Sequence, residues 1–186
     1  MDYLNIKKNG QTIMAPDKVY KKTELIKKFI DFITSSGFEF IKWIKNFSTP
    51  YECEVLSPDK IDYDLVLYLK NITGAGWKTK PDKKRAQVSN IRIVAPEDYI
   101  PTSKNKSVLI LGYYNFDNNP LMVAWDAYRY IKHNTIRSTY ISVDNLKRGY
   151  QSGYIVTTDA SQKVWIFDEK HFDKFLKDYI TYNTDK

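Results

Sequence analysis

Residues 108–130 read VLILGYYNFDNNPLMVAWDAYRY and contain the clearest structural signal in the chain. Two runs rich in aliphatic and aromatic residues, 108–116 and 121–130, flank the tetrapeptide DNNP at 117–120. Asp, Asn and Pro each favour tight turns, because their side chains stabilise or preset turn backbone angles. The stretch therefore predicts two antiparallel strands joined as a β-hairpin.

Shorter segments of β-forming residues lie on both sides of this hairpin. They predict strands over 51–56, 63–69, 86–94, 138–143, 154–157 and 164–167. Apolar residues at helical spacing instead predict helices over 20–34 and 168–180. A short helix over 145–150, capped by Ser142 or Asp144, and an ambiguous segment at 38–47 complete the pattern.

About seven strands with helices at the ends predict an α+β fold. We expect a mainly antiparallel β pseudobarrel with flanking helices, including an N-terminal amphipathic helix. The chain of 186 residues fits one compact domain. Within it, residues 1–50 would form a helical segment packed on the core, and 51–186 the pseudobarrel.

The composition also favours a globular, intracellular protein. Hydrophobic residues make up 42% of the chain, which suffices for a packed core. No apolar run is long enough to span a bilayer, and the first residues lack the apolar region of a signal peptide. Cys53 is the single cysteine, so no disulfide framework is expected. These features predict a cytoplasmic protein with no membrane partner.

Positive charge is concentrated in two short segments. Residues 78–92 hold six basic residues and one acid, and 129–137 hold three basic residues and no acid. Together they carry the whole basic surplus of a chain whose net charge is +7. A localised basic footprint is typical of proteins that bind nucleic acid. Because loops between strands of a small barrel converge, we expect the two segments to form one surface.

The side chains of the two basic segments suit duplex DNA. Lysine and arginine neutralise phosphates, whereas arginine, asparagine and glutamine can also read base edges in the major groove. If Ala86 and Val88 face the core, then Arg85, Gln87 and Ser89 share the outer face of a strand. The first segment would therefore combine lysines that bind phosphates with a strand whose outward side chains contact base edges.

We assign roles to these residues in three groups. Base edges would be read by Arg85, Gln87, Asn90, Arg129, Asn134 and Arg137. Phosphates would be held by Lys78, Lys80, Lys83, Lys84, Arg92 and Lys132. Ser89, His133 and Trp77 complete the predicted DNA-binding set. Trp77 would either stack on a base or sugar or close the end of the barrel, and both roles stay open.

Catalytic motifs are absent from the sequence. His133 and His171 are the only histidines, and no zinc-protease, P-loop or dinucleotide-binding pattern occurs. The PD-(D/E)xK nuclease pattern is also missing, because no Pro-Asp pair is followed at a suitable distance by an acid-x-Lys on a strand. We therefore expect no catalytic residue, no metal and no cofactor in this chain.

The two basic arms on a β-rich domain resemble a known class of DNA-binding domain. The segments KTKPDKKRAQVSNIR and YRYIKHNTIRS, together with YDLVLYLKNITGAGW, resemble the plant B-three type pseudobarrel, which also occurs in the restriction enzymes EcoRII and BfiI. Within that class, the chain looks similar to the N-terminal domain of LlaJI-type, McrB-related restriction subunits. The resemblance covers about residues 51–180 and does not include the first helix.

The resemblance implies sequence-specific binding of double-stranded DNA without cleavage by this domain. Residues 78–92 would be the N-arm and 129–138 the C-arm of a grip on the major groove. The implied partners are an AAA+ GTPase motor on the same chain and a separate nuclease subunit, in a restriction system used for phage defence. Three alternatives remain: a reader of a methylated, flipped base, a small metal-dependent nuclease, and an RNA-binding module.

Overall fold

The computed structural model describes residues 1–88, 105–130 and 137–184. The strands are β1 (Tyr3–Ile6), β2 (Thr12–Ala15), β3 (Glu39–Lys45), β4 (Tyr51–Leu56), β5 (Asp62–Asn71), β6 (Thr73–Gly74), β7 (Lys83–Val88), β8 (Ser107–Tyr114), β9 (Leu121–Trp125), β10 (Arg137–Ser142), β11 (Tyr154–Asp159) and β12 (Gln162–Phe167). The α-helices are α1 (Lys22–Ser35), α2 (Val143–Ser152) and α3 (Phe172–Thr184), and two 3-10 turns are η2 (Ala127–Tyr130) and η3 (Glu169–His171).

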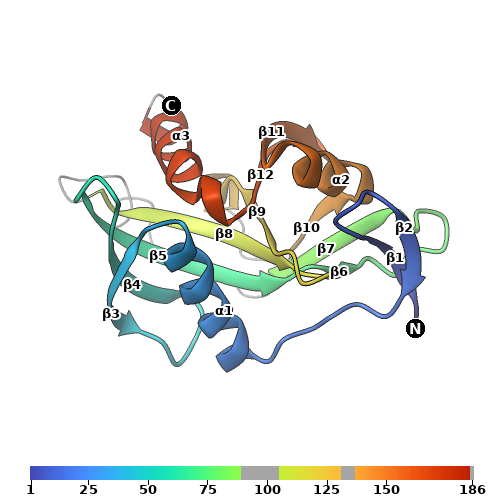
Figure 1. Cartoon of the computed structure of the whole chain (residues 1–186), viewed down its shortest axis with the longest axis horizontal. Helices are drawn as coiled ribbons and strands as arrows, with labels where there is room; N and C mark the ends of the chain where they lie inside the picture. Colours follow the sequence, from blue (N-terminus) through green and yellow to red (C-terminus); the bar gives the residue numbers. More distant parts are fainter. Residues whose placement is uncertain (89–104, 131–136, 185–186) are drawn as a thin grey trace.

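A seven-stranded sheet forms the centre of the molecule, in the order β11-β12-β9-β8-β5-β4-β3. Its two long middle strands, β5 and β8, run parallel and lie side by side in Figure 1. All its other neighbours are antiparallel, including the predicted β8–β9 hairpin. Residues 65–69 of β5 and 108–111 of β8 are apolar and buried, as expected for strands covered on both faces.

Two hydrophobic cores lie on opposite faces of this sheet. On β5, Leu65, Leu67 and Leu69 belong to one core, and Val66 and Tyr68 belong to the other. This alternation follows from the two-residue period of a strand. The first core is covered by α1 and α3, and the second by α2 with a small three-stranded sheet in the order β10-β7-β6.

The three predicted helices are present, but their ends differ from the predicted ones by one to four residues. Helix α1 buries Leu25, Phe29, Phe32 and Ile33, which recur at helical spacing. The Ser142 hydroxyl caps α2 by accepting a hydrogen bond from the Asn145 amide, at 3.2 Å. This contact decides the cap in favour of Ser142 over Asp144.

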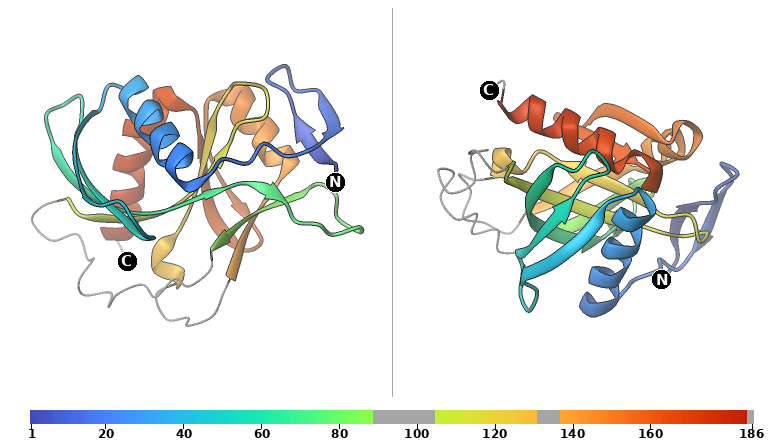
Figure 2. Two further views of the ribbon diagram at one scale, coloured as in Figure 1. Left: turned by 90° about the horizontal axis from the view of Figure 1, so that it is seen from below. Right: turned by 60° about the vertical axis from the view of Figure 1, so that its left-hand side comes forward.

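The N-terminal hairpin β1–β2 lies at the same end of the molecule as β6 and β7 (Figures 1 and 2). The ring of Tyr3 packs directly on Gly74, where an added Cβ would lie 1.9 Å from a ring carbon. Gly74 therefore has to remain a glycine for the hairpin to reach the small sheet. This contact places the first strand of the chain against β6, just before the first basic segment.

The α+β class is confirmed, but two details of the prediction are wrong. The pseudobarrel is not closed, because within the described residues the large sheet ends at the edge strands β11 and β3. The prediction of a helix as the N-terminal element is not confirmed either, since the chain opens with the β1–β2 hairpin and α1 follows it. The ambiguous segment 38–47 contains β3.

Candidate nucleic-acid interface

The small sheet joins the two basic segments. Strand β7 comes from the first segment and β10 starts at the end of the second, and the two strands pair antiparallel. In this register Gln87 lies opposite Ser138, and Arg85 lies opposite Tyr140. Figure 2 shows the two strands side by side. The two segments are thus neighbours in space, although about fifty residues separate these partners along the chain.

Strand β7 has a buried face and an open face. Ala86 and Val88 are fully buried in the second core, whereas Gln87 is exposed and Arg85 is partly exposed. The predicted alternation along this strand is therefore confirmed up to residue 88. The side chains of Arg85 and Gln87 form no hydrogen bond or ion pair with another side chain in the described part of the protein.

Two aromatic rings stand beside these polar side chains. Trp77 is 42% exposed and contacts Tyr140, with the ring centroids 4.7 Å apart and an interplanar angle of 33°. The Lys80 ammonium lies 5.9 Å from the centroid of the Trp77 ring. Part of the Trp77 side chain therefore stays accessible to a stacking partner.

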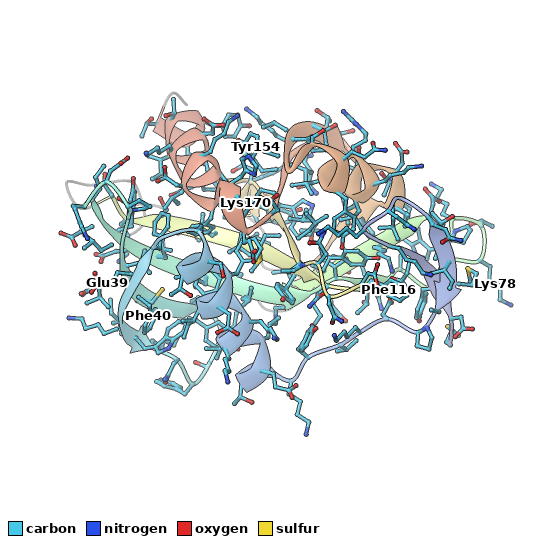
Figure 3. The ribbon with its side chains drawn as sticks, viewed as in Figure 1. Glu39, Phe40, Lys78, Phe116, Tyr154 and Lys170 are labelled. Carbon is cyan, nitrogen blue, oxygen red and sulfur yellow. The ribbon has the colours of Figure 1, made fainter. Side chains whose placement is uncertain are left out.

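Lys78 and Arg129 flank this face from two sides. Lys78 is exposed in the loop that projects past β6 and β7, where Figure 3 labels it. Arg129 lies in η2 and is exposed, and its guanidinium donates a hydrogen bond to the Ser161 carbonyl at 2.6 Å. It lines a cavity of about 160 Å³ together with Ser138 and Tyr140. One face thus combines cations from both basic segments.

Lys84 does not belong to this face. Its side chain is fully buried, and its ammonium donates a 2.6 Å hydrogen bond to a carboxylate oxygen of Asp17. The other oxygen of Asp17 accepts the Gly74 amide at 2.5 Å, and the ammonium lies 5.5 Å from the centroid of the Tyr114 ring. Burial lowers the pKa of Lys84, and the hydrogen bond and charge of Asp17 oppose this. The prediction of Lys84 as a phosphate ligand is wrong, because the inward face of β7 takes it into the core.

The side chain of Lys83 also has a carboxylate partner within the protein. Its ammonium donates to a carboxylate oxygen of Asp159 at 2.9 Å. The second oxygen of Asp159 accepts from the Ser142 amide at 2.8 Å and from the Asn145 side chain at 2.9 Å. This network ties β7 to α2 and β11. Lys83 therefore acts first as a structural ion-pair partner rather than as a free phosphate ligand.

The Asp159 network makes stability depend on pH. Burial alone would raise the pKa of Asp159, but hydrogen bonds from Lys83, Ser142 and Asn145 lower it below its ordinary value of 3.8. The folded protein therefore binds fewer protons than the unfolded chain near this pH. The resulting stability is present above the unfolded pKa and is lost as the pH falls through the folded pKa.

We expect wild-type protein to lose more free energy of unfolding than an Asp159→Asn variant when the pH falls from about 6 to about 3. Urea unfolding at a series of pH values measures this difference. The exposed Asp144→Asn variant is the control and should keep the wild-type slope. Equal slopes for wild type and Asp159→Asn would contradict the assignment.

Part of the predicted DNA-binding set lies outside the described residues. These residues are Ser89, Asn90, Arg92, Lys132, His133 and Asn134. For Arg137 the structure places the backbone, which pairs with Val88 at the start of β10.

The sequence analysis did not single out Tyr140, although its outward position follows from the alternation along residues 138–143. Asp17 and Asp159 could not be found that way, because their lysine partners are distant in the sequence.

The described residues contain neither a candidate membrane helix nor a candidate metal centre. No helix among them has the length and apolar character needed to cross a bilayer. No group of three or more histidine, cysteine, aspartate or glutamate side chains among them could hold a metal ion.

Comparison with known proteins identifies a family. No curated protein and no solved structure matches the chain. A family model described as Methylase-associated X1 (MTaX1) matches residues 63–176, which run from β5 into α3 and include both β7 and β10. A methylase-associated family fits the predicted restriction-modification context, whereas the likeness to LlaJI-type subunits and B-three domains stays a prediction. The match covers more than half of the chain, which therefore belongs to the Methylase-associated X1 family.

Proposed function

We propose that this chain is the double-stranded DNA recognition domain of a restriction-modification system. The observation that carries the proposal is the pairing of β7 with β10, which joins the two basic segments on one face. The family supports the context, because its description links it to methylases. The side chains on this face support the proposal of a DNA interface.

Each part of this face has a chemical role in the proposal. Arg85 and Gln87 present planar, hydrogen-bonding groups that can pair in a bidentate manner with base edges in the major groove. Lys78 and Lys80 lie in the adjacent loop and would hold phosphates. Trp77 would pack its open ring surface on a sugar or base. In the B-three likeness, these residues form the N-arm, and Arg129 with β10 belongs to the C-arm.

Cleavage and translocation would belong to other components. We propose that this domain binds DNA without cutting it and that it works in the cytoplasm. A separate nuclease subunit would cut, and an AAA+ GTPase motor on the same chain would move the DNA. The proposed division of labour predicts that the purified chain binds duplexes but leaves plasmid DNA intact in the presence of magnesium.

The salt dependence of binding tests the electrostatic part of the proposal. Of the six lysines and arginines assigned to phosphates, Lys83 and Lys84 are paired with carboxylates. Four phosphate contacts remain, so a plot of log affinity against log salt should have a slope of about −4. Fluorescence anisotropy with a labelled duplex measures it. A slope near zero would contradict phosphate binding by this face.

A cavity beside Trp77 favours the modified-base reader as the second candidate. It has a volume of about 190 Å³ and is lined by Tyr3, Leu4, Met14 and Lys80 as well as Trp77. An apolar pocket with an aromatic wall next to a DNA-binding face could accept a flipped base. A methylated duplex in the same anisotropy experiment separates the candidates. Tighter binding than to the unmethylated duplex would favour the reader over simple sequence recognition.

A further inference from the structure

The cavity beside Arg129 contains polar groups that the proposed base reading does not use. It has a volume of about 160 Å³ and lies between η2, β10 and the β11–β12 turn. Pockets for drug-sized ligands begin at about 300 Å³, so this cavity suits a single small group. Its described lining includes the hydrogen-bond donors of Arg129, Ser138 and Gln162 and no acidic side chain. The formal charge of that lining is therefore positive.

The side-chain amide of Gln162 is the buried donor of this cavity. Gln162 is 7% exposed, and its side-chain oxygen accepts a hydrogen bond from the Tyr130 hydroxyl at 2.8 Å. Its side-chain nitrogen has no hydrogen-bond partner in the described part of the chain. This nitrogen does not belong to the fully enclosed atoms without a partner, so it keeps contact with the cavity that Gln162 lines. Leaving a buried donor unpaired is unfavourable, so the amide is arranged for an acceptor that comes from outside.

The β11–β12 turn holds the guanidinium of Arg129 at the same cavity. One guanidinium nitrogen donates to the Ser161 carbonyl at 2.6 Å, and Arg129 forms no ion pair with a described carboxylate. The turn is tight, because Ala160 and Ser161 both have positive φ angles, of 48° and 62°. Most N–H groups of Arg129 therefore remain for a ligand. The Ser138 hydroxyl on β10 is a further donor that has no partner among the described residues.

We propose that this cavity binds a phosphate group. The guanidinium of Arg129 would supply the positive charge and parallel N–H groups that match two phosphate oxygens. The Gln162 amide and the Ser138 hydroxyl would donate to the same group. In this role Arg129 holds a phosphate, whereas the sequence analysis assigned it to a base edge.

The position of the cavity indicates one source of the phosphate. Tyr140 lines the cavity and also contacts Trp77 on the proposed DNA-binding face. A backbone phosphate of a bound duplex could therefore reach the cavity, and the phosphate of a free nucleotide has the same chemistry. The assignment to DNA rests on the function proposed above, whereas the phosphate site itself does not.

The first test follows the Gln162 side-chain amide by NMR in ¹⁵N-labelled protein, with sodium chloride keeping the ionic strength constant. The probes are inorganic phosphate and dimethyl phosphate, because neither contains a base or a sugar. We expect a saturable shift of the Gln162 amide that chloride alone does not produce. No saturable shift with either probe would overturn the proposal.

Variants assign the effect to this cavity, with the Arg129 Nε–H signal as the readout. Gln162→Glu keeps an acceptor for the Tyr130 hydroxyl but replaces the donor with an oxygen that repels phosphate, so it should weaken binding by about tenfold. Ser138→Ala should weaken binding by about threefold, and it decides the question if Gln162→Glu does not fold.

Gln151→Glu is the matched control. It makes the same chemical change at an exposed position of α2, before the end of β11 that lies opposite the β11–β12 turn. It should change phosphate affinity by less than about twofold. Equal weakening by Gln151→Glu, or no weakening by Gln162→Glu and Ser138→Ala, would overturn the site.

Two further ligands distinguish the sources of the phosphate. Fluorescence anisotropy measures a labelled duplex, and the NMR titration measures deoxyadenosine monophosphate. Weaker binding of every duplex by Gln162→Glu assigns the phosphate to DNA, and weaker binding of the nucleotide alone assigns it to a small molecule. Unchanged affinity for both ligands would overturn this inference and leave the proposed function intact. Phosphate binding by a protein that binds no duplex would instead contradict the proposed function and leave the phosphate site intact.

Discussion

Asp17→Ala is expected to lower the free energy of unfolding by about 3–5 kcal/mol. The substitution leaves the fully buried ammonium of Lys84 without its carboxylate partner, and it also removes the acceptor of the Gly74 amide. An unpaired charge in the core is far more unfavourable than a lost surface contact. Urea unfolding followed by tryptophan fluorescence measures the change. Asp2→Ala, which removes an exposed carboxylate, should change stability by less than about 0.5 kcal/mol.

The double variant Asp17→Leu, Lys84→Met should recover the part of that loss that comes from the unpaired charge, whereas the Gly74 amide still lacks its acceptor. The lowered pKa of Lys84 indicates that burial of its charge is only partly offset by Asp17. Replacing both partners with apolar side chains of similar size removes the desolvation cost together with the attraction. The pair would then matter mainly for placing β7 rather than for net stability. A single-variant loss below about 1 kcal/mol would contradict the buried pairing.

Arg85→Ala is expected to weaken binding to the preferred duplex by about 1–3 kcal/mol and to relax discrimination among sequences. Arg85 lies on the outward face of β7, opposite Tyr140, and forms no bond with another described side chain. Gln87→Ala should act in the same direction for the neighbouring base pair. Selection of bound duplexes from a random pool gives the preferred site, and anisotropy then gives the affinities.

A matched control separates base reading from loss of charge. Lys27→Ala removes one positive charge from an exposed position of α1, remote from β7, and should change affinity by less than about twofold. If Arg85→Ala weakens all sequences equally, the side chain holds phosphate and does not read a base. If Arg85→Ala leaves every affinity unchanged, the proposed interface is wrong.

Local patterns predicted much of the fold. The DNNP turn gives the β8–β9 hairpin, and the apolar spacing of Phe172, Phe175 and Leu176 places the buried face of α3. The alternation from Arg85 to Val88 correctly separated outward from inward side chains. These features depend on residues within a few positions of one another, where turn chemistry and side-chain periodicity act directly.

Local sequence patterns did not predict which residues pair when they lie far apart along the chain. The parallel contact of β5 with β8 and the open edges of the sheet depend on which strands meet, and local preference does not specify this. The same holds for the carboxylate partners of Lys83 and Lys84, which lie 76 and 67 residues away. Charge density alone therefore overestimated the number of lysines in the first basic segment that have no carboxylate partner.

By itself, the sequence determined where the basic surplus lies, which residues alternate on β7 and which residues form the turns. Only the tertiary structure showed that β7 pairs with β10, that Lys84 is buried, and that the rings of Trp77 and Tyr140 are in contact. The physical reason is that periodicity assigns a side chain to a face of its own strand. The neighbouring elements then decide whether that face meets solvent or a buried carboxylate.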